Sequence, residues 1–126
     1  MDAKTLEWLK QADYDMDAAE FMAAGGRCFY AVFMCHLAIE KALKGLYQQR
    51  QQQPPPRTHN LVYLMNEVGL KPNEHQARAV ATLNGANIAT RYPEDIETLR
   101  SNYTEAVTAG LLGQAKELLA WIKTQF

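Results

Sequence analysis

Cysteine is scarce in this chain of 126 residues, which contains only Cys28 and Cys35. Both fall on one predicted helix, where their spacing places them about 10.5 Å apart along the axis. A disulfide requires Cα atoms within roughly 7 Å, and zinc sites require tighter spacing and more ligands. We therefore expect two small side chains buried in a core, and no metal site.

Long apolar runs are also missing. No stretch reaches the ~18 residues that a membrane span needs, and the charged start Met1–Glu7 lacks the apolar core of a signal peptide. We therefore expect a cytoplasmic protein without a membrane partner, and a single domain over residues 1–126. The net charge of −1 argues against a strongly basic nucleic-acid binder but permits a local basic patch.

Several motifs of catalysis and cofactor binding are absent. The sequence contains no Gly-rich phosphate loop, no Gly-x-Ser-x-Gly elbow and no His-Glu-x-x-His. The three histidines, His36, His59 and His75, are scattered along the chain. We therefore expect no cofactor, and the sequence motifs identify no catalytic residue.

Helical periodicity, by contrast, is abundant, and it is clearest in residues 28–47. Bulky side chains recur on one stripe and small ones on a second, while a third stripe begins apolar at Tyr30 and becomes basic at Lys41 and Lys44. A helix that is apolar on nearly all sides must be buried on several of them. We predict that residues 28–47 form the central helix of a bundle. The small stripe consists of Cys28, Ala31, Cys35, Ala38, Ala42 and Gly45.

The rest of the chain is also predicted to be helical. No stretch alternates between apolar and polar residues with period two, so we expect no sheet. The predicted fold is all-α, an up-and-down antiparallel helical bundle of four long helices plus a short one. Its apolar helical surface exceeds what four antiparallel helices need, which predicts a homodimer through a helix face. Beside the central helix, we expect a first helix over residues 3–24, a short helix opening at Thr58–Leu61, and a helix from Asn73 to about Arg91. A loop over residues 92–100 and a last helix from about Asn102 to Lys123 should follow. The residues expected to point inward from the helix that starts at Asn73 are Ala77, Val80, Ala81, Leu83 and Ile88.

Three carboxylates, Asp13, Asp17 and Glu20, fall on one face of the first predicted helix. They are candidates for a metal or general acid–base site. The favoured alternative is a solvated acidic stripe that faces Lys41 and Lys44 of the central helix.

The central helix carries polar candidates of its own. His36 and Glu40 lie one turn apart, and a carboxylate at that spacing can orient an imidazole. The favoured alternative is a buried histidine that a neighbour satisfies. Lys41 and Lys44 lie beside Glu40, either in an ion pair within the helix, which we favour, or as part of an anion site.

A polar row runs along the helix that starts at Asn73. Asn84, Asn87 and Arg91 lie at i, i+3 and i+7, and Tyr92 follows directly. An arginine supplies a planar fork suited to phosphate, and a tyrosine can stack on a base. The alternative for Arg91 is a salt bridge to residues 94–95 or a neighbouring helix, which would pin the loop.

Short motifs follow one another in a fixed order along essentially the whole chain. They are Gly25-Gly26, Phe29-Tyr30-Ala31, Ile39-Glu40-Lys41-Ala42-Leu43-Lys44, Thr58-His59-Asn60-Leu61 after Pro56, and Arg91-Tyr92-Pro93. Read together, these motifs resemble the HEPN domain (higher eukaryotes and prokaryotes nucleotide-binding domain). The resemblance implies a helical bundle, usually a homodimer, that acts with a separate minimal nucleotidyltransferase, in toxin–antitoxin pairs or in nucleotide and RNA handling.

Members of this family that cleave RNA carry an arginine, then four to six residues, then a histidine. After Arg91, none of residues 96–98 is histidine, so the chain departs from that pattern. The resemblance therefore favours a non-catalytic nucleotide- or RNA-binding module in which Arg91 contacts phosphate. Two alternatives stay open: a metal-independent ribonuclease in which His36 or His59 is brought close to Arg91, and a purely structural dimerisation domain.

Overall fold

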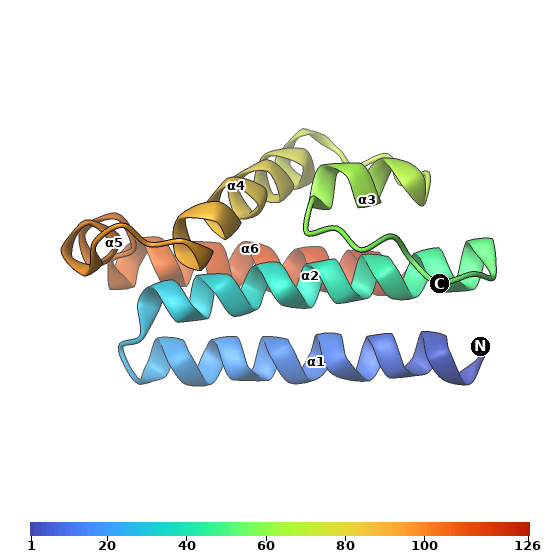
Figure 1. The fold of residues 1–126 in the computed structure, drawn as a ribbon, viewed down its shortest axis with the longest axis horizontal. Helices are drawn as coiled ribbons and strands as arrows, with labels where there is room; N and C mark the ends of the chain where they lie inside the picture. Colours follow the sequence, from blue (N-terminus) through green and yellow to red (C-terminus); the bar gives the residue numbers. More distant parts are fainter.

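The chain folds into helices alone. The computed structural model describes residues 1–126 and contains no strand (Figure 1). Four long helices run alternately up and down, which confirms the predicted bundle. The structure has two short helices, whereas one was expected. The long helices are α1 (Ala3–Ala24), α2 (Cys28–Gln51), α4 (Glu74–Arg91) and α6 (Glu105–Lys123), and the short ones are α3 (Leu61–Glu67) and α5 (Ile96–Asn102).

Helix α2 lies at the centre of the bundle and packs against each of the other five helices. Its side chains Ile39, Leu43 and Leu46 are fully buried. The stripe of small residues lets α1 approach closely, because a Cβ atom added to Gly45 would lie 3.0 Å from the Cβ atom of Trp8. The central-helix prediction is confirmed, and the helix extends one turn further than residues 28–47.

Both cysteines are free thiols, as the sequence predicts, but only Cys35 is buried as expected, whereas Cys28 is partly exposed. Burial raises the pKa of the Cys35 thiol to about 12, so this side chain stays protonated and serves as a small core residue. The reversal between α1 and α2 falls at the two glycines expected there. Gly26 adopts a φ of 74°, a conformation that favours glycine, which explains why the chain turns at this point.

The segment from residue 92 to residue 104 differs from its prediction. The expected loop over residues 92–100 is wrong, because α5 begins at Ile96, where the Asp95 side chain accepts hydrogen bonds from the N–H groups of Glu97 and Thr98. The last helix begins later than expected, at Glu105, with Thr104 rather than Asn102 as its N-cap. Leu99 alone is buried in α5, so the helix has no apolar periodicity to reveal it.

Helix α4 buries only part of the apolar face that the sequence predicts for it. Val80 and Leu83 are buried, as predicted, whereas Ala77, Ala81 and Ile88 were expected to point inward and are exposed. Asn87 and Thr90 are buried instead, because their polar groups find partners near the C-terminal end of the helix. At this end of α4, Arg91 lies against α2, with its guanidinium over the ring of Phe33.

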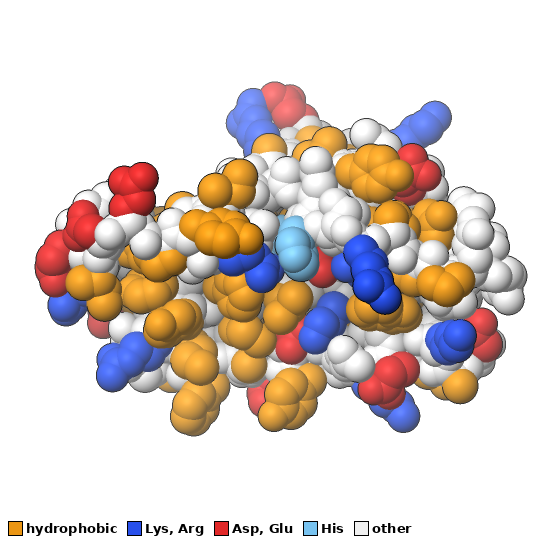
Figure 2. Space-filling view, in the orientation of Figure 1, with side chains coloured by type: hydrophobic (Ala, Val, Ile, Leu, Met, Phe, Trp, Pro, Cys, Tyr) orange, Lys and Arg blue, Asp and Glu red, His pale blue; other side chains and the backbone are white.

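The surface combines apolar and basic regions. Figure 2 shows hydrophobic side chains gathered over one half of the α1–α2 face, and a histidine between basic side chains near its middle. The side chains of Tyr14 and Phe21 on α1 are about three-quarters exposed. None of the helices has the combination of length and apolar character that crossing a membrane requires.

Candidate functional site

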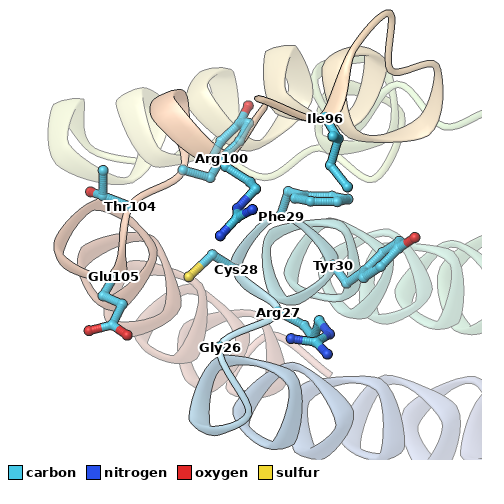
Figure 3. A pocket seen from close by; sticks show the side chains of 10 residues that line it. Gly26, Arg27, Cys28, Phe29, Tyr30, Ile96, Arg100, Thr104 and Glu105 are labelled. Carbon is cyan, nitrogen blue, oxygen red and sulfur yellow. The ribbon is translucent and has the colours of Figure 1, made fainter. Parts of the chain in front are cut away.

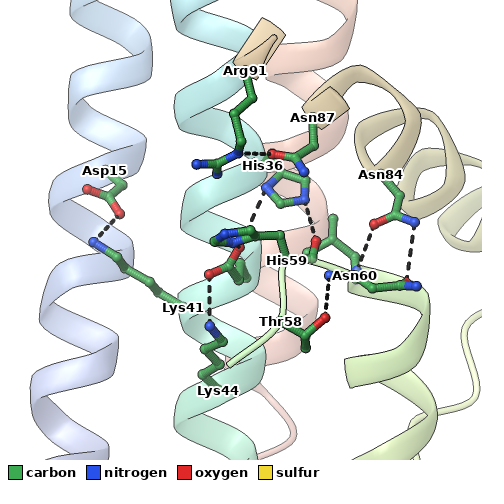
Figure 4. Close-up of polar contacts among 12 residues, drawn as sticks. Asp15, His36, Lys41, Lys44, Thr58, His59, Asn60, Asn84, Asn87 and Arg91 are labelled. Carbon is green, nitrogen blue, oxygen red and sulfur yellow. Dashed lines mark hydrogen bonds and ion pairs between the residues drawn. The ribbon is translucent and has the colours of Figure 1, made fainter. Parts of the chain in front are cut away.

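Polar side chains from three segments meet beside the middle of α2 (Figure 4). His36, Glu40 and Lys44 lie on one stripe of α2, at the i, i+4 and i+8 positions. His59 comes from the extended segment that precedes α3, and Arg91 from the last turn of α4. We call these five residues the Arg91 cluster. A cavity of about 540 Å³ lies elsewhere, at the α1–α2 turn, and no residue of the cluster lines it (Figure 3).

The buried carboxylate of Glu40 links Lys44 to His59. One of its oxygens, Oε2, accepts a hydrogen bond from Lys44 Nζ at 3.0 Å. The other, Oε1, lies 2.8 Å from Nδ1 of His59. A carboxylate accepts hydrogen bonds, so Nδ1 of His59 carries the donated proton. Both oxygens therefore have partners inside the protein, and the ion pair with Lys44 that the sequence favoured is present.

His59 is held by one ring nitrogen and free at the other. Its Nδ1 atom is fixed on Glu40, and its side chain is 53% exposed. The exposed Nε2 atom has no hydrogen-bond partner in the protein, and in the neutral ring it holds the lone pair. A carboxylate-anchored imidazole with a free nitrogen is the arrangement that general acid–base catalysis uses.

His36 is fully buried and has a different role. Its Nε2 atom donates to the backbone carbonyl of His59 at 2.9 Å, so the segment before α3 is tied to α2. Its Nδ1 atom lies 3.8 Å from Glu40 and has no hydrogen-bond partner. Burial lowers the pKa of His36 to about 4, although the Glu40 charge opposes the shift. His36 is therefore neutral near pH 7 and positions His59.

Arg91 carries an uncompensated positive charge at the end of α4. Its Nε atom donates to Oδ1 of Asn87 at 3.2 Å, and its guanidinium lies over the ring of Phe33, 4.8 Å from the centroid. Its Nη2 atom is buried and has no partner. The salt bridge to Glu94 or Asp95, the alternative considered for this arginine, is not formed. Arg91 therefore keeps hydrogen-bonding capacity that the protein itself does not use.

Three other sequence candidates lie near this cluster. Asn84 accepts from the N–H of Leu61 at 2.8 Å and donates to Asn60 at 3.3 Å, so its amide joins α4 to the start of α3. Asn87 holds Arg91, as described. Tyr92 is exposed directly after Arg91, where its ring is free to stack.

Lys41 and the acidic stripe of α1 belong to interhelical ion pairs instead. Lys41 pairs with Asp15 of α1 at 2.8 Å (Figure 4). The stripe faces α6, where Asp13 pairs with Lys123 and Glu20 with Lys116. The expectation that it faces Lys41 and Lys44 is therefore wrong. No group of His, Cys, Asp and Glu side chains has an arrangement that would hold a metal ion.

The structure thus brings together the candidates His36, Glu40, Lys44, Asn87 and Arg91. It adds His59, which the sequence offered only as a base for the ribonuclease alternative. The contact between His59 and Glu40 joins residues 19 positions apart, and no spacing rule within a helix or strand predicts it. Its one sequence indication was the place of His59 in the Thr58-His59-Asn60-Leu61 motif.

Comparisons with known proteins agree on one family. The HEPN domain model matches residues 5–125. The crystal structure of ST0689, an archaeal HEPN homologue, is 27% identical, covers 98% of each chain and superposes with a TM-score of 0.78. The crystal structure of TT1696 from Thermus thermophilus is 24% identical, covers 99% of this chain and 100% of its own, and has a TM-score of 0.85, which supports the fold. No curated protein matches the chain.

Proposed function

The chain belongs to the HEPN domain family, and from this premise we propose that it binds the phosphate groups of nucleotides or RNA through Arg91. One observation carries the proposal: the guanidinium of Arg91 has no carboxylate partner, and its buried Nη2 atom has no hydrogen-bond acceptor. A guanidinium in this state is suited to a phosphate, because its planar fork matches two phosphate oxygens.

The surroundings of Arg91 support an anionic ligand. Lys44 is neutralised by Glu40, so the positive charge of Arg91 is the unpaired one in the cluster when both histidines are neutral. The free Nε2 atom of His59 offers a further polar contact, and Tyr92 offers an exposed ring for a base. We infer a non-catalytic binding module in which Arg91 holds phosphate and Tyr92 stacks.

A binding titration tests this function. The change is Arg91→Ala, measured by fluorescence anisotropy with short labelled RNAs and nucleotides at low salt. We expect affinity to fall roughly tenfold to a hundredfold, because a charge-assisted hydrogen bond contributes about 1.5–3 kcal/mol. Arg78→Ala is the matched control, since Arg78 is exposed and pairs only with Glu74. Equal losses in the two variants, or no binding by the wild type, would refute the Arg91 site.

A second function, metal-independent RNA cleavage, is favoured by the geometry of His59. Its Nε2 atom would accept the proton of a ribose 2′-OH, and the 2′-oxygen would attack the adjacent phosphorus. The bond from phosphorus to the 5′-oxygen would break, and that oxygen would take a proton from solvent. The products are a 2′,3′-cyclic phosphate and a 5′-hydroxyl end. Arg91 would stabilise the extra negative charge on the phosphorus oxygens.

Incubation of RNA with the protein in excess EDTA separates the two functions. Cleavage that leaves a 2′,3′-cyclic phosphate and disappears in His59→Ala, but not in His75→Ala, would establish the ribonuclease. His75 is a suitable control because its side chain is exposed and lies beside Glu117 of α6, which is not part of the cluster. Intact RNA together with Arg91-dependent binding would establish the non-catalytic module.

We also propose that the chain forms a homodimer. Tyr14 and Phe21 lie two turns apart on α1, and both are largely exposed, as expected for a surface that another chain covers. Light scattering at micromolar concentration tests this, with a double Tyr14→Ser, Phe21→Ser variant as the disruptive change. A monomeric wild type would remove the proposal and, with it, the purely structural dimerisation role.

The family resemblance extends the proposal to a separate minimal nucleotidyltransferase chain, as one half of a toxin–antitoxin pair. Co-expression with such a chain followed by gel filtration tests the association. Separate elution of the two chains would refute it.

A further inference from the structure

The end of α4 and the short helix α5 form the two walls of a groove that no residue of the Arg91 cluster lines. Pro93 has no N–H group with which to continue α4, so the chain leaves this helix after Tyr92 and returns as α5. Leu99 is the buried residue that anchors α5. The groove has a volume of about 300 Å³, and its lining runs from Ile88 on α4 to Asn102 at the end of α5.

Two large apolar side chains of this groove are in solvent. Ile88 is 67% exposed and Tyr92 is 72% exposed, and they lie one turn apart at the end of α4. The apolar pattern of α4 predicts that Ile88 points inward, yet the fold leaves it uncovered. Exposed apolar side chains that stand together mark a surface that another molecule covers. Because both side chains project from the surface, the groove suits a chain that lies across it, whereas a small molecule requires an enclosing site.

The charged side chains of the groove are acidic. Glu94 and Asp95 line it, and no lysine or arginine does. Hydrogen bonds from the hydroxyl and the N–H of Thr98 lower the pKa of Asp95, so this carboxyl group is ionised near pH 7. Figure 2 shows further acidic side chains gathered over α5 at this end of the molecule. The groove therefore combines exposed apolar side chains with negative charge.

Neither arginine of this region lines the groove. The guanidinium of Arg91 lies over the ring of Phe33 on α2. Arg100 pairs with Glu97 and lines the separate cavity at the α1–α2 turn. The negative charge of the groove therefore repels the phosphates of RNA and of an anionic membrane surface, and it attracts a cationic segment.

We propose that the groove between α4 and α5 is the docking site for a segment of another protein that carries lysines or arginines around an apolar side chain. The apolar side chain packs against Ile88 and Tyr92, and the cations lie beside Glu94 and Asp95. Buried apolar anchors supply most of the affinity of such contacts, and charges at the rim accelerate association and select the partner. The inference does not depend on RNA binding at Arg91.

The test measures the binding of short fluorescein-labelled peptides to the full chain by anisotropy, in the absence of RNA. The first peptide carries lysines around two leucines. In the second, glutamates replace the lysines, and in the third, serines replace the leucines. We expect the lysine–leucine peptide to bind at least about tenfold more tightly than either of the others, because it alone provides both the apolar anchor and the cations.

Two matched pairs of variants locate the site, and none of them changes Tyr92, which takes part in both proposals. In Ile88→Ser we expect the affinity for the lysine–leucine peptide to fall about tenfold, because an apolar contact is lost. In Ile96→Ser it should change by less than about twofold. Ile96 is a suitable control because it is 59% exposed and does not line the groove.

The second pair tests the charge. In Glu94→Gln we expect affinity to fall about threefold at low salt, because one rim charge is removed. In Glu67→Gln it should stay unchanged, since Glu67 is an exposed carboxylate at the end of α3. All four side chains to be changed are exposed, so the variants should fold, which circular dichroism checks.

Heteronuclear NMR gives an independent location. We expect the lysine–leucine peptide to shift the backbone signals of residues 88–102 and to leave those of residues 26–30, at the other cavity, in place. Shifts at residues 26–30 alone would overturn the proposal, as would equal binding of the three peptides or equal losses in Ile88→Ser and Ile96→Ser.

The absence of any peptide binding by the wild type would also overturn the proposal. If, in addition, light scattering showed that Ile88→Ser separates a dimer of the wild type, the groove would be assigned to a second copy of this chain instead. Peptide binding is measured without RNA, so its failure leaves the Arg91 proposal intact, and the failure of RNA binding leaves the groove proposal intact.

Discussion

Glu40 and Arg91 lie in one cluster, but the protein satisfies them to very different degrees. Both oxygens of Glu40 accept hydrogen bonds from protein donors, one from Lys44 and one from His59. Arg91 makes one hydrogen bond to the protein, through Nε, and its buried Nη2 atom makes none. A carboxylate with both oxygens paired contributes to stability, whereas a partly exposed guanidinium that has an unused N–H group and no carboxylate partner is suited to bind an anion. The comparison predicts that variants of the α2 side lose stability and variants of Arg91 lose binding.

The largest effect is expected for Glu40→Ala. This change leaves the buried Lys44 ammonium without an acceptor and frees the His59 ring, so we expect a loss of about 3–5 kcal/mol in the free energy of unfolding. Urea denaturation measures it. The matched control is Glu20→Ala, which removes a more exposed ion pair with Lys116 and should cost less than about 1 kcal/mol. Similar losses in the two variants would contradict the central role given to Glu40.

His36→Ala comes next. The variant loses a fully buried side chain and its hydrogen bond to the His59 carbonyl, so we expect a destabilisation of about 3 kcal/mol. His75→Ala alters an exposed side chain and should stay within about 0.5 kcal/mol of the wild type. Thermal melts of the two variants make the comparison. Equal melting temperatures would contradict the burial of His36 on the central helix.

A pH dependence follows from the same residue. The folded pKa of His36 is about 4, below the ordinary value of 6.5, so the unfolded chain binds the proton more tightly. The difference in proton binding leaves the unfolding free energy unchanged above about pH 6.5. As the pH falls from there toward 4, protonation of His36 in the unfolded chain lowers the unfolding free energy progressively, by about 3 kcal/mol. We expect the unfolding free energy of the wild type to fall more steeply over this range than that of His36→Asn. Parallel curves would mean that His36 titrates normally.

The prediction from sequence succeeded where the determinants are local. The start of α4 follows from Asn73 and Gln76, which form a capping box within one turn, and the pairing of Glu40 with Lys44 follows from helical spacing. The short helix α5 was missed because a single buried residue, Leu99, leaves no periodic pattern.

Contacts between distant segments could not be predicted from the sequence, for a different reason. The burial of Asn87 on α4 depends on its hydrogen bond to Arg91 and on the packing of α4 against α2. Similarly, Lys41 has acidic residues available at several positions, and only the packing of α1 on α2 selects Asp15. Spacing along one helix therefore predicted which residues share a face, while the partner of each residue across a helix interface required the three-dimensional structure.

We expect the smallest changes in stability for variants of Asn84 and Arg91. Comparing the two variants separates a residue that contributes to stability from one that contributes to binding. Asn84→Ala removes the acceptor for the Leu61 N–H at the start of α3, so it should destabilise by about 1–2 kcal/mol and leave RNA affinity unchanged. Arg91→Ala removes an uncompensated, partly buried charge but also the donor to Oδ1 of Asn87. Because these two effects oppose each other, we expect a stability within about 1 kcal/mol of the wild type, together with a marked loss of affinity. Urea denaturation and anisotropy on the same samples provide both values. If Arg91→Ala instead unfolds the protein while Asn84→Ala abolishes binding, then the unpartnered guanidinium is a structural residue and the ligand lies at the start of α3.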